Sequence, residues 1–120
     1  METHISHELY EEYLRVTLTG KFPVREARDL ILKMRELSDM HRKTKIMVDS
    51  LNIDAPVSAI HRYSIGILIA EIFDGNHKIA VLFNPMLINA FTEDVANNRG
   101  VYMKVMGDES QALAWLLGRS

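Results

Sequence analysis

A group of polar side chains follows the short apolar run Lys45-Ile46-Met47-Val48 and is the best candidate for a binding site in this sequence. Its members carry carboxylate, hydroxyl or amide groups: Asp49, Ser50, Asn52, Asp54 and Ser58. The run is typical of a central strand buried on both faces. Open α/β sheets place ligand sites at the carboxyl ends of such strands. We therefore predict a partner- or ligand-binding site in the turn that follows Asp49.

The same residues also have a purely structural interpretation. In it, Asp49 ends the strand, Asn52 and Asp54 form side-chain turns, and Pro56 with Ser58 begins the next helix. The sequence leaves both interpretations open.

Other kinds of chemistry find little support in the spacing of residues. The sequence contains neither G-x-G-x-x-G nor G-x-x-x-x-G-K-[ST], which disfavours the standard dinucleotide and P-loop sites. It has no G-x-S-x-G turn for a serine nucleophile and no H-E-x-x-H zinc motif. His4 and His7 would point to opposite faces of a strand. We therefore expect a protein that is not an enzyme and that has no metal site and no cofactor.

The composition is that of an ordinary folded domain. The chain has 120 residues, of which 48% are hydrophobic and 25% charged, and its formal net charge is -2. This length predicts one domain over residues 1–120. The charge provides no positive field for nucleic acid, so we expect none as a partner.

Two further features bear on location. The absence of cysteine suits a reducing compartment. The start of the chain does not resemble a signal peptide, and its most apolar stretch, 63–73, falls short of the ~20 residues needed to span a membrane. We expect a cytoplasmic protein without a membrane span.

The first elements are predicted from periodicity. Polar and apolar residues alternate over 13–19, which is typical of a half-buried strand. An apolar run over 5–10 precedes it, separated by Glu11 and Glu12, and the pair predicts a β-hairpin. Pro23 suits the first position of a helix. That helix carries apolar residues at three- and four-residue intervals: Ala27, Leu30, Ile31, Met34 and Leu37.

A second helix is predicted from Val57 to Asp74, and it is apolar on more than one face. Ile60 and Ile67 lie opposite the broad apolar face of this helix. Either another part of the chain covers them, or they form an exposed patch that marks a dimer or partner surface.

The remaining segments complete an alternating order. Strands are predicted over 78–83 and 101–106, a helix over 87–96, and a final helix after Asp108, a good N-cap. The resulting order, β-β-α-β-α-β-α-β-α, predicts an α/β fold with a mixed, mostly parallel sheet of about five strands and four helices.

Three segments of this pattern together resemble the STAS group of anti-sigma-factor-antagonist-like (SpoIIAA-like) domains. They are Lys45-Ile46-Met47-Val48-Asp49-Ser50, Phe91-x-x-x-Val95-Ala96-Asn97-Asn98-Arg99-Gly100-Val101 and Asp108-Glu109-x-x-Ala112-Leu113-Ala114-Trp115-Leu116. The resemblance covers nearly the whole chain and implies a STAS-like fold.

The resemblance also implies a regulatory function, with one departure. Regulatory members of the family carry a phosphorylatable Ser or Thr after an Asp at the start of the second helix, in a D-S-x-G-like turn. The matching stretch here reads Asp54-Ala55-Pro56-Val57 and lacks both the acceptor and the glycine. Ser58 lies a few residues on. Phosphorylation of Ser50 or Ser58 is left open.

Two hypotheses for function follow. The first is a non-catalytic protein-interaction module, which binds through the Asp54 to Ser58 region and the second helix and has an unidentified protein or a second copy of itself as partner. The alternative is a small domain of the same fold that binds an apolar ligand or lipid, with the excess isoleucines lining a cavity.

Overall fold

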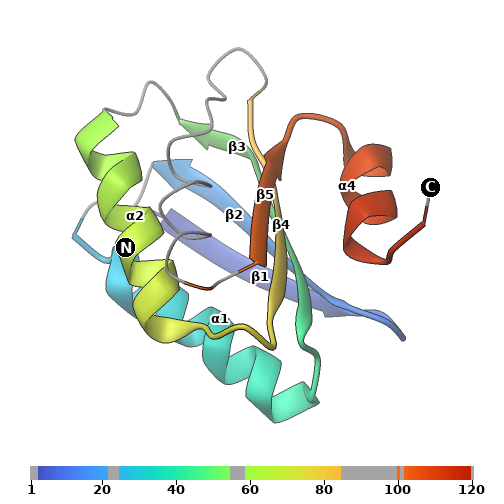
Figure 1. Ribbon diagram of the computed structural model, residues 1–120. Helices are drawn as coiled ribbons and strands as arrows, with labels where there is room; N and C mark the ends of the chain where they lie inside the picture. Colours follow the sequence, from blue (N-terminus) through green and yellow to red (C-terminus); the bar gives the residue numbers. More distant parts are fainter. Residues whose placement is uncertain (1–2, 22–24, 55–58, 85–99, 101, 120) are drawn as a thin grey trace.

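The protein is a mixed β-sheet with helices on both faces (Figure 1). The computed structural model describes residues 3–21, 25–54, 59–84, 100 and 102–119, with only the backbone described for 59–63. Within these residues the strands are β1 (Thr3–Leu9), β2 (Leu14–Lys21), β3 (Lys45–Asp54), β4 (Lys78–Leu82) and β5 (Tyr102–Met106). The helices are α1 (Ala27–His41), α2 (Ala59–Ile72) and α4 (Glu109–Leu116).

The strands lie side by side in the order β1-β2-β3-β4-β5. β1 and β2 pair antiparallel, which confirms the predicted N-terminal hairpin. The other three pairings, from β2 to β5, are parallel. The sheet is therefore mixed, as predicted, with β1 at one edge.

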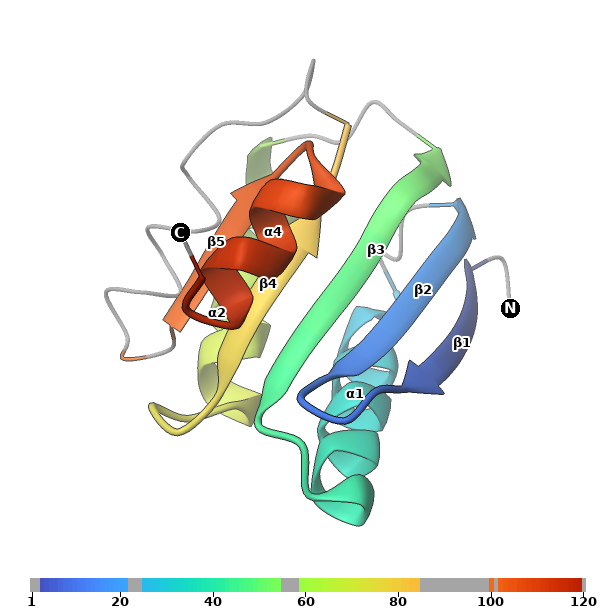
Figure 2. The same ribbon diagram turned by 90° about the vertical axis from the view of Figure 1, so that its right-hand side faces the viewer.

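The two faces of the sheet have separate apolar cores. On one face, α1 and α2 cover a large core that includes Val16, Ile46 and Ile79. On the other, α4 covers a smaller core around Met47 and Leu82. Figure 2 shows that α4 lies over β4 and β5, and that no described helix lies over β1 and β2 on that face.

Several predicted boundaries differ from those in the structure. The first helix begins at Ala27, after Glu26, rather than at Pro23, because Arg25 and Glu26 form a bend. The second helix is described over Ala59–Ile72 and ends two residues before the predicted Asp74, while its predicted start at Val57 lies outside the described residues. Three helices are present among the described residues, against four predicted, and the predicted helix over 87–96 lies outside those residues. No described helix is long and apolar enough to cross a membrane.

Candidate functional site

The strand that carries the predicted site is longer than the sequence suggests. β3 continues to Asp54, so the prediction that the chain turns after Asp49 is wrong. The register of β2 and β3 shifts between Thr17 and Thr19, and beyond the shift the pairing resumes, with Thr19 opposite Asn52. A β-bulge of this kind accommodates an extra residue while the strands stay paired. Asp49, Ser50, Asn52 and Asp54 therefore belong to a strand.

Asp49 is held in an ion pair that joins three elements. Its Oδ2 accepts a hydrogen bond of 2.7 Å from Nη2 of Arg15 on β2. Nη1 of the same guanidinium donates to Glu109, in the first turn of α4, and to Sδ of Met47 at 3.4 Å. The side chains of Arg15 and Asp49 are only 16% and 13% exposed. Asp49 therefore contributes to the packing of β2, β3 and α4, although it does not end the strand as its structural interpretation expects.

The electrostatics of this cluster centre on the guanidinium. Burial lowers the pKa of Arg15, but the hydrogen bonds and charges of Glu109 and Asp49 outweigh burial, so that its pKa is raised. Nearby, burial and the Tyr10 hydroxyl raise the pKa of Tyr13. The cluster is thus a fixed positive charge paired with two carboxylates.

Ser50 is buried, and its hydroxyl donates a hydrogen bond of 2.5 Å to the carbonyl oxygen of Leu82 on β4. A buried hydroxyl with this partner is inaccessible to a kinase in the folded chain. Ser50 therefore has a structural place in the sheet.

The far end of β3 is the part of the predicted site that faces solvent. Asn52 and Asp54 are exposed, and Leu51 beside them is one of the exposed large apolar residues, at 38%. Through the register, Asn52 and Asp54 lie opposite Thr19 and Lys21 of β2. Two polar side chains and one large apolar side chain are thus exposed along the last residues of β3.

The apolar helix of the prediction is α2. Ile69 and Phe73, which follows its end, are buried in the larger core, and Ile65 packs against it. Ile67 is half-buried and is not part of that core. Ile60 is helical, but its side chain lies outside the described residues, as does all of Ser58. Whether Ile60 and Ile67 form one patch stays a prediction.

The structure describes the side chains of four histidines: His4, His7, His41 and His77. His7 contacts the ring of His41 on α1, while His4 lies on the opposite face of β1. His77 is 4% exposed, and its Nδ1 lies 2.8 Å from Oδ1 of Asp74. Among the residues that the structure describes, no three His, Asp or Glu side chains gather as metal ligands.

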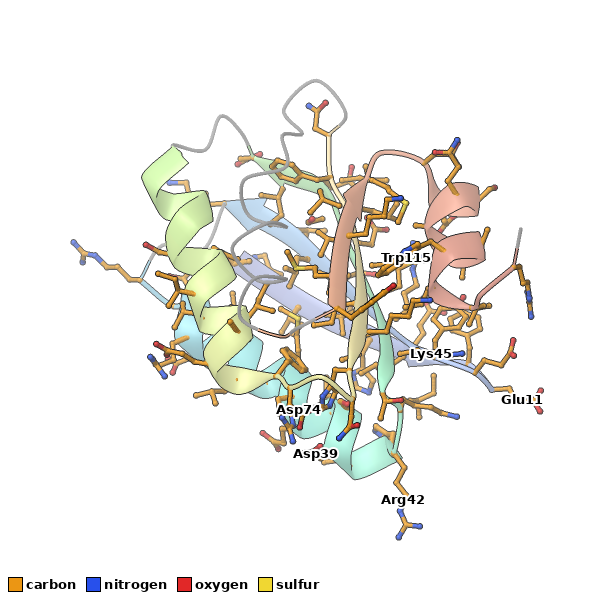
Figure 3. The ribbon with its side chains drawn as sticks, in the orientation of Figure 1. Glu11, Asp39, Arg42, Lys45, Asp74 and Trp115 are labelled. Atoms are coloured by element: carbon orange, nitrogen blue, oxygen red, sulfur yellow. The ribbon has the colours of Figure 1, made fainter. Side chains whose placement is uncertain are left out.

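Sequence reasoning missed a second polar cluster beneath α4. Nζ of Lys78 lies 4.6 Å from the centre of the Trp115 ring, and it donates to the Trp115 carbonyl oxygen at 2.5 Å. Trp115 lies between α4 and the sheet and stacks on Tyr102 (Figure 3). Burial lowers the pKa of Lys78, and the charge of Lys45, opposite it on β3, lowers it further. Only the tertiary fold brings these side chains together.

The missed ion pair had a signal in the sequence. Arg15 is on the polar side of the alternating segment 13–19, and parallel pairing puts it on the same face as Asp49. The alternation alone could not identify Asp49 as its partner, because the register of β2 against β3 is not encoded locally.

Comparison with solved structures supports the expected fold. An anti-sigma factor antagonist from Mycobacterium paratuberculosis superposes with a TM-score of 0.67 at 9% sequence identity, over 96% of this chain and 94% of that one. An uncharacterised protein with a SpoIIAA-like fold from Shewanella loihica superposes with a TM-score of 0.52 at 20% identity, over 95% of this chain and 93% of that one.

No family profile and no curated protein matches the sequence of the chain. The assignment therefore rests on the strand order, the two-sided helix packing and the two superpositions. Together they show that the chain has a SpoIIAA-like fold.

Proposed function

We propose that the chain is a non-catalytic regulatory module that binds another protein through the end of β3 and the α2 helix. In this proposal residues 1–120 act as one domain in the cytoplasm. The observation that carries it is the exposed end of β3, where Leu51 lies beside Asn52 and Asp54, in a fold shared with an anti-sigma factor antagonist.

The contrast within β3 supports a binding role for its end alone. Asp49 and Ser50 are committed to Arg15 and Leu82, and they stabilise the sheet. Asn52 and Asp54 are exposed, and four residues join Asp54 to α2. Exposed polar residues next to an exposed apolar residue are common at protein interfaces.

In this proposal the partner is regulated without phosphorylation of Ser50. The hydroxyl of Ser50 is buried against β4, and the stretch Asp54-Ala55-Pro56-Val57 offers no acceptor. Binding would then depend on the presence of the partner and not on a phosphate placed at the start of α2.

The test is capture of partners from cells that produce the protein, using wild type and two charge-reversal variants. Asp54→Lys changes the proposed surface, and Glu11→Lys makes the same change in the hairpin turn, at the opposite end of the sheet (Figure 3). We expect a stoichiometric partner to be retained by wild type and Glu11→Lys and lost by Asp54→Lys, with circular dichroism confirming that both variants fold. Equal recovery by all three would show that the surface is wrong.

The helix is tested in the same assay. Ile67→Asp changes α2, and Leu32→Asp changes an apolar residue of α1 that is 45% exposed. We expect only Ile67→Asp to lose the partner, with circular dichroism confirming that both variants fold. Native mass spectrometry of the purified protein covers the alternative: a co-purifying lipid or apolar molecule that is lost in Ile67→Asp would contradict the protein-binding proposal.

A further inference from the structure

The edge strand β1 lacks the features that prevent edge strands from pairing with other chains. Edge strands are commonly protected by proline, by lysine, by a bulge or by shortness. β1 is seven residues long, Thr-His-Ile-Ser-His-Glu-Leu, without proline or lysine, and its register with β2 is unbroken. No described helix or strand lies beside its outer edge (Figure 2).

The hairpin determines which backbone groups of β1 point outward. The N–H of Tyr10 donates to the carbonyl of Tyr13 at 3.0 Å, so this is a hydrogen-bonded pair. Such pairs alternate along an antiparallel ladder. His4, Ser6 and Glu8 therefore bond to β2, whereas the N–H and C=O groups of the intervening residues point away from the sheet: Thr3, Ile5, His7 and Leu9.

We propose that a second copy of this chain pairs antiparallel with β1 about a two-fold axis at Ser6, joining the two sheets into one. In this register Ile5 lies opposite the partner copy's His7, and Thr3 opposite its Leu9. The backbone N–H and C=O groups of these four residues all point away from the sheet, as those of hydrogen-bonded pairs between the two copies must. In this register β1 is paired over its full length in both copies. Leu9, which is 47% exposed in a single copy, lies opposite Thr3 of the other copy.

The side chains of β1 are complementary in this register. His4 of each copy lies directly opposite Glu8 of the other, in a non-hydrogen-bonded pair, where side chains approach most closely. Both side chains are exposed on the face that α4 leaves uncovered. An imidazole always carries at least one N–H, and the Glu8 carboxylate, which accepts from Tyr10 at 3.2 Å, has further acceptor sites. Two such pairs form by symmetry.

The strand at the other edge of the sheet is a useful contrast. β5 is five residues long and has Lys104 at its centre. Antiparallel pairing of two β5 strands about their centres would place Lys104 opposite itself, and like charges directly opposite destabilise a sheet. β1 has the uncharged Ser6 at the equivalent place. Pairing of two copies is therefore more favourable at β1 than at β5.

The edge of one strand is a small contact, so we expect a weak dimer that depends on concentration. Disulfide trapping is suited to such a contact, because the chain has no cysteine of its own. Residues opposite each other in a non-hydrogen-bonded pair have Cα atoms about 4.5 Å apart, within the range for a disulfide. Ser6→Cys lies on the proposed axis and should form a covalent dimer under mild oxidation.

His4→Cys is the matched control on the same face of the same strand. In the proposed dimer its two copies lie four residues apart along the strands, roughly 13 Å, too far for a disulfide. We expect His4→Cys alone to stay monomeric, and an equimolar mixture with Glu8→Cys to form the heterodimer. If Ser6→Cys and His4→Cys are trapped equally, or neither is trapped, the proposal is wrong.

A charge swap tests the same register without cysteine. His4→Glu should weaken the dimer about tenfold in sedimentation velocity, since it places two carboxylates opposite each other at two sites. Glu8→Lys should also weaken it, because it removes the carboxylate that accepts from His4. The double variant His4→Glu with Glu8→Lys should regain wild-type association. Failure of the double variant to recover, with both single variants folded, would overturn the proposed pairing.

Discussion

At the scale of single residues, Arg15 joins parts of the chain that are far apart in sequence. Its guanidinium contacts Asp49 on β3 and Glu109 on α4, and both Arg15 and Asp49 are mostly buried. A buried ion pair adds little compared with an apolar replacement, but the loss of one partner leaves the other charge unpaired. Substituting Arg15 or Asp49 alone should therefore destabilise the protein more than substituting both.

We expect Arg15→Met to lower the free energy of unfolding by about 2–4 kcal/mol, because Asp49 is left buried without its cation. Urea denaturation measures the change. Adding Asp49→Asn to Arg15→Met should recover part of the loss. Arg119→Met is the control, since its ion pair with Glu12 is exposed and should contribute less than ~1 kcal/mol. If Arg15→Met and Arg119→Met lower the free energy of unfolding equally, the Arg15–Asp49 ion pair does not stabilise the fold as proposed.

The burial of Ser50 predicts that a negative charge at this position unfolds the sheet locally. Ser50→Ala removes one hydrogen bond to Leu82 and should cost about 1 kcal/mol. Ser50→Asp buries a carboxylate and should cost about 3 kcal/mol or more. Ser110→Asp, at an exposed position of α4, is the control. If Ser50→Asp has the same Tm as wild type, the side chain at position 50 is accessible to solvent and not buried.

Asp74 gives a pH dependence with a defined sign. The N–H of Asn76 and then the hydrogen bond to His77 lower its pKa from the ordinary 3.8. The folded state thus holds the Asp74 proton less readily than the unfolded state, so this stabilisation is present above about pH 4 and lost as pH falls through the lowered pKa. Between about pH 4 and pH 2, wild type should lose more free energy of unfolding than Asp74→Asn. If the free energies of unfolding of wild type and Asp74→Asn change in parallel over this pH range, Asp74 contributes nothing to the pH dependence.

At the scale of elements, α4 shows how a short helix is fixed to the sheet. It has eight residues, too few to be stable in isolation. Ala112 and Leu116 are buried against the sheet, Glu109 contacts Arg15, and Lys78 bonds to the carbonyl of Trp115. These contacts anchor the helix near both of its ends.

The N-cap of α4 predicts a measurable local effect. Oδ1 of Asp108 accepts the N–H of Gln111 at 2.9 Å, as the sequence indicated. Asp108→Ala should lower the free energy of unfolding by about 1 kcal/mol, whereas Asp108→Asn should be close to neutral because asparagine caps about as well. Chemical denaturation distinguishes the two. A neutral Asp108→Ala would mean that α4 depends on packing alone.

At the scale of the molecule, periodicity predicted the elements well and their polar ends poorly. The alternation over 13–19 and the spacing of Ala27, Leu30 and Met34 identified β2 and α1, because each pattern reflects one buried face. Ser50, Asn52 and Asp54 suggested a turn, since these residue types favour turns. Pairing with β2 beyond the bulge overrides that local preference.

The candidate site was therefore predicted only in part. The exposed end of β3 was within the predicted set, but the roles of Asp49 and Ser50 depend on Arg15, Leu82 and Glu109, which lie on other elements. Such contacts follow from register and helix placement, and neither is written in a local pattern.

The pattern of amide hydrogen exchange at β1 should reflect the whole assembly. In dilute protein, the amides of Ser6 and Glu8, which bond to β2, should exchange more slowly than those of Ile5 and His7, which point outward. At high concentration, Ile5 and His7 should become protected if two copies pair. NMR-detected exchange measures both. Uniform exchange along β1 at low concentration would contradict the assigned directions.

The strand order has a consequence for synthesis of the chain. Because β1 to β5 are neighbours in space in the order in which they occur in the sequence, each strand emerging from the ribosome can join a sheet that already exists. No strand has to be inserted between two that are already paired. The N-terminal hairpin is synthesised before the strands that pair beside it, and this arrangement lets the sheet grow from one side, one strand at a time.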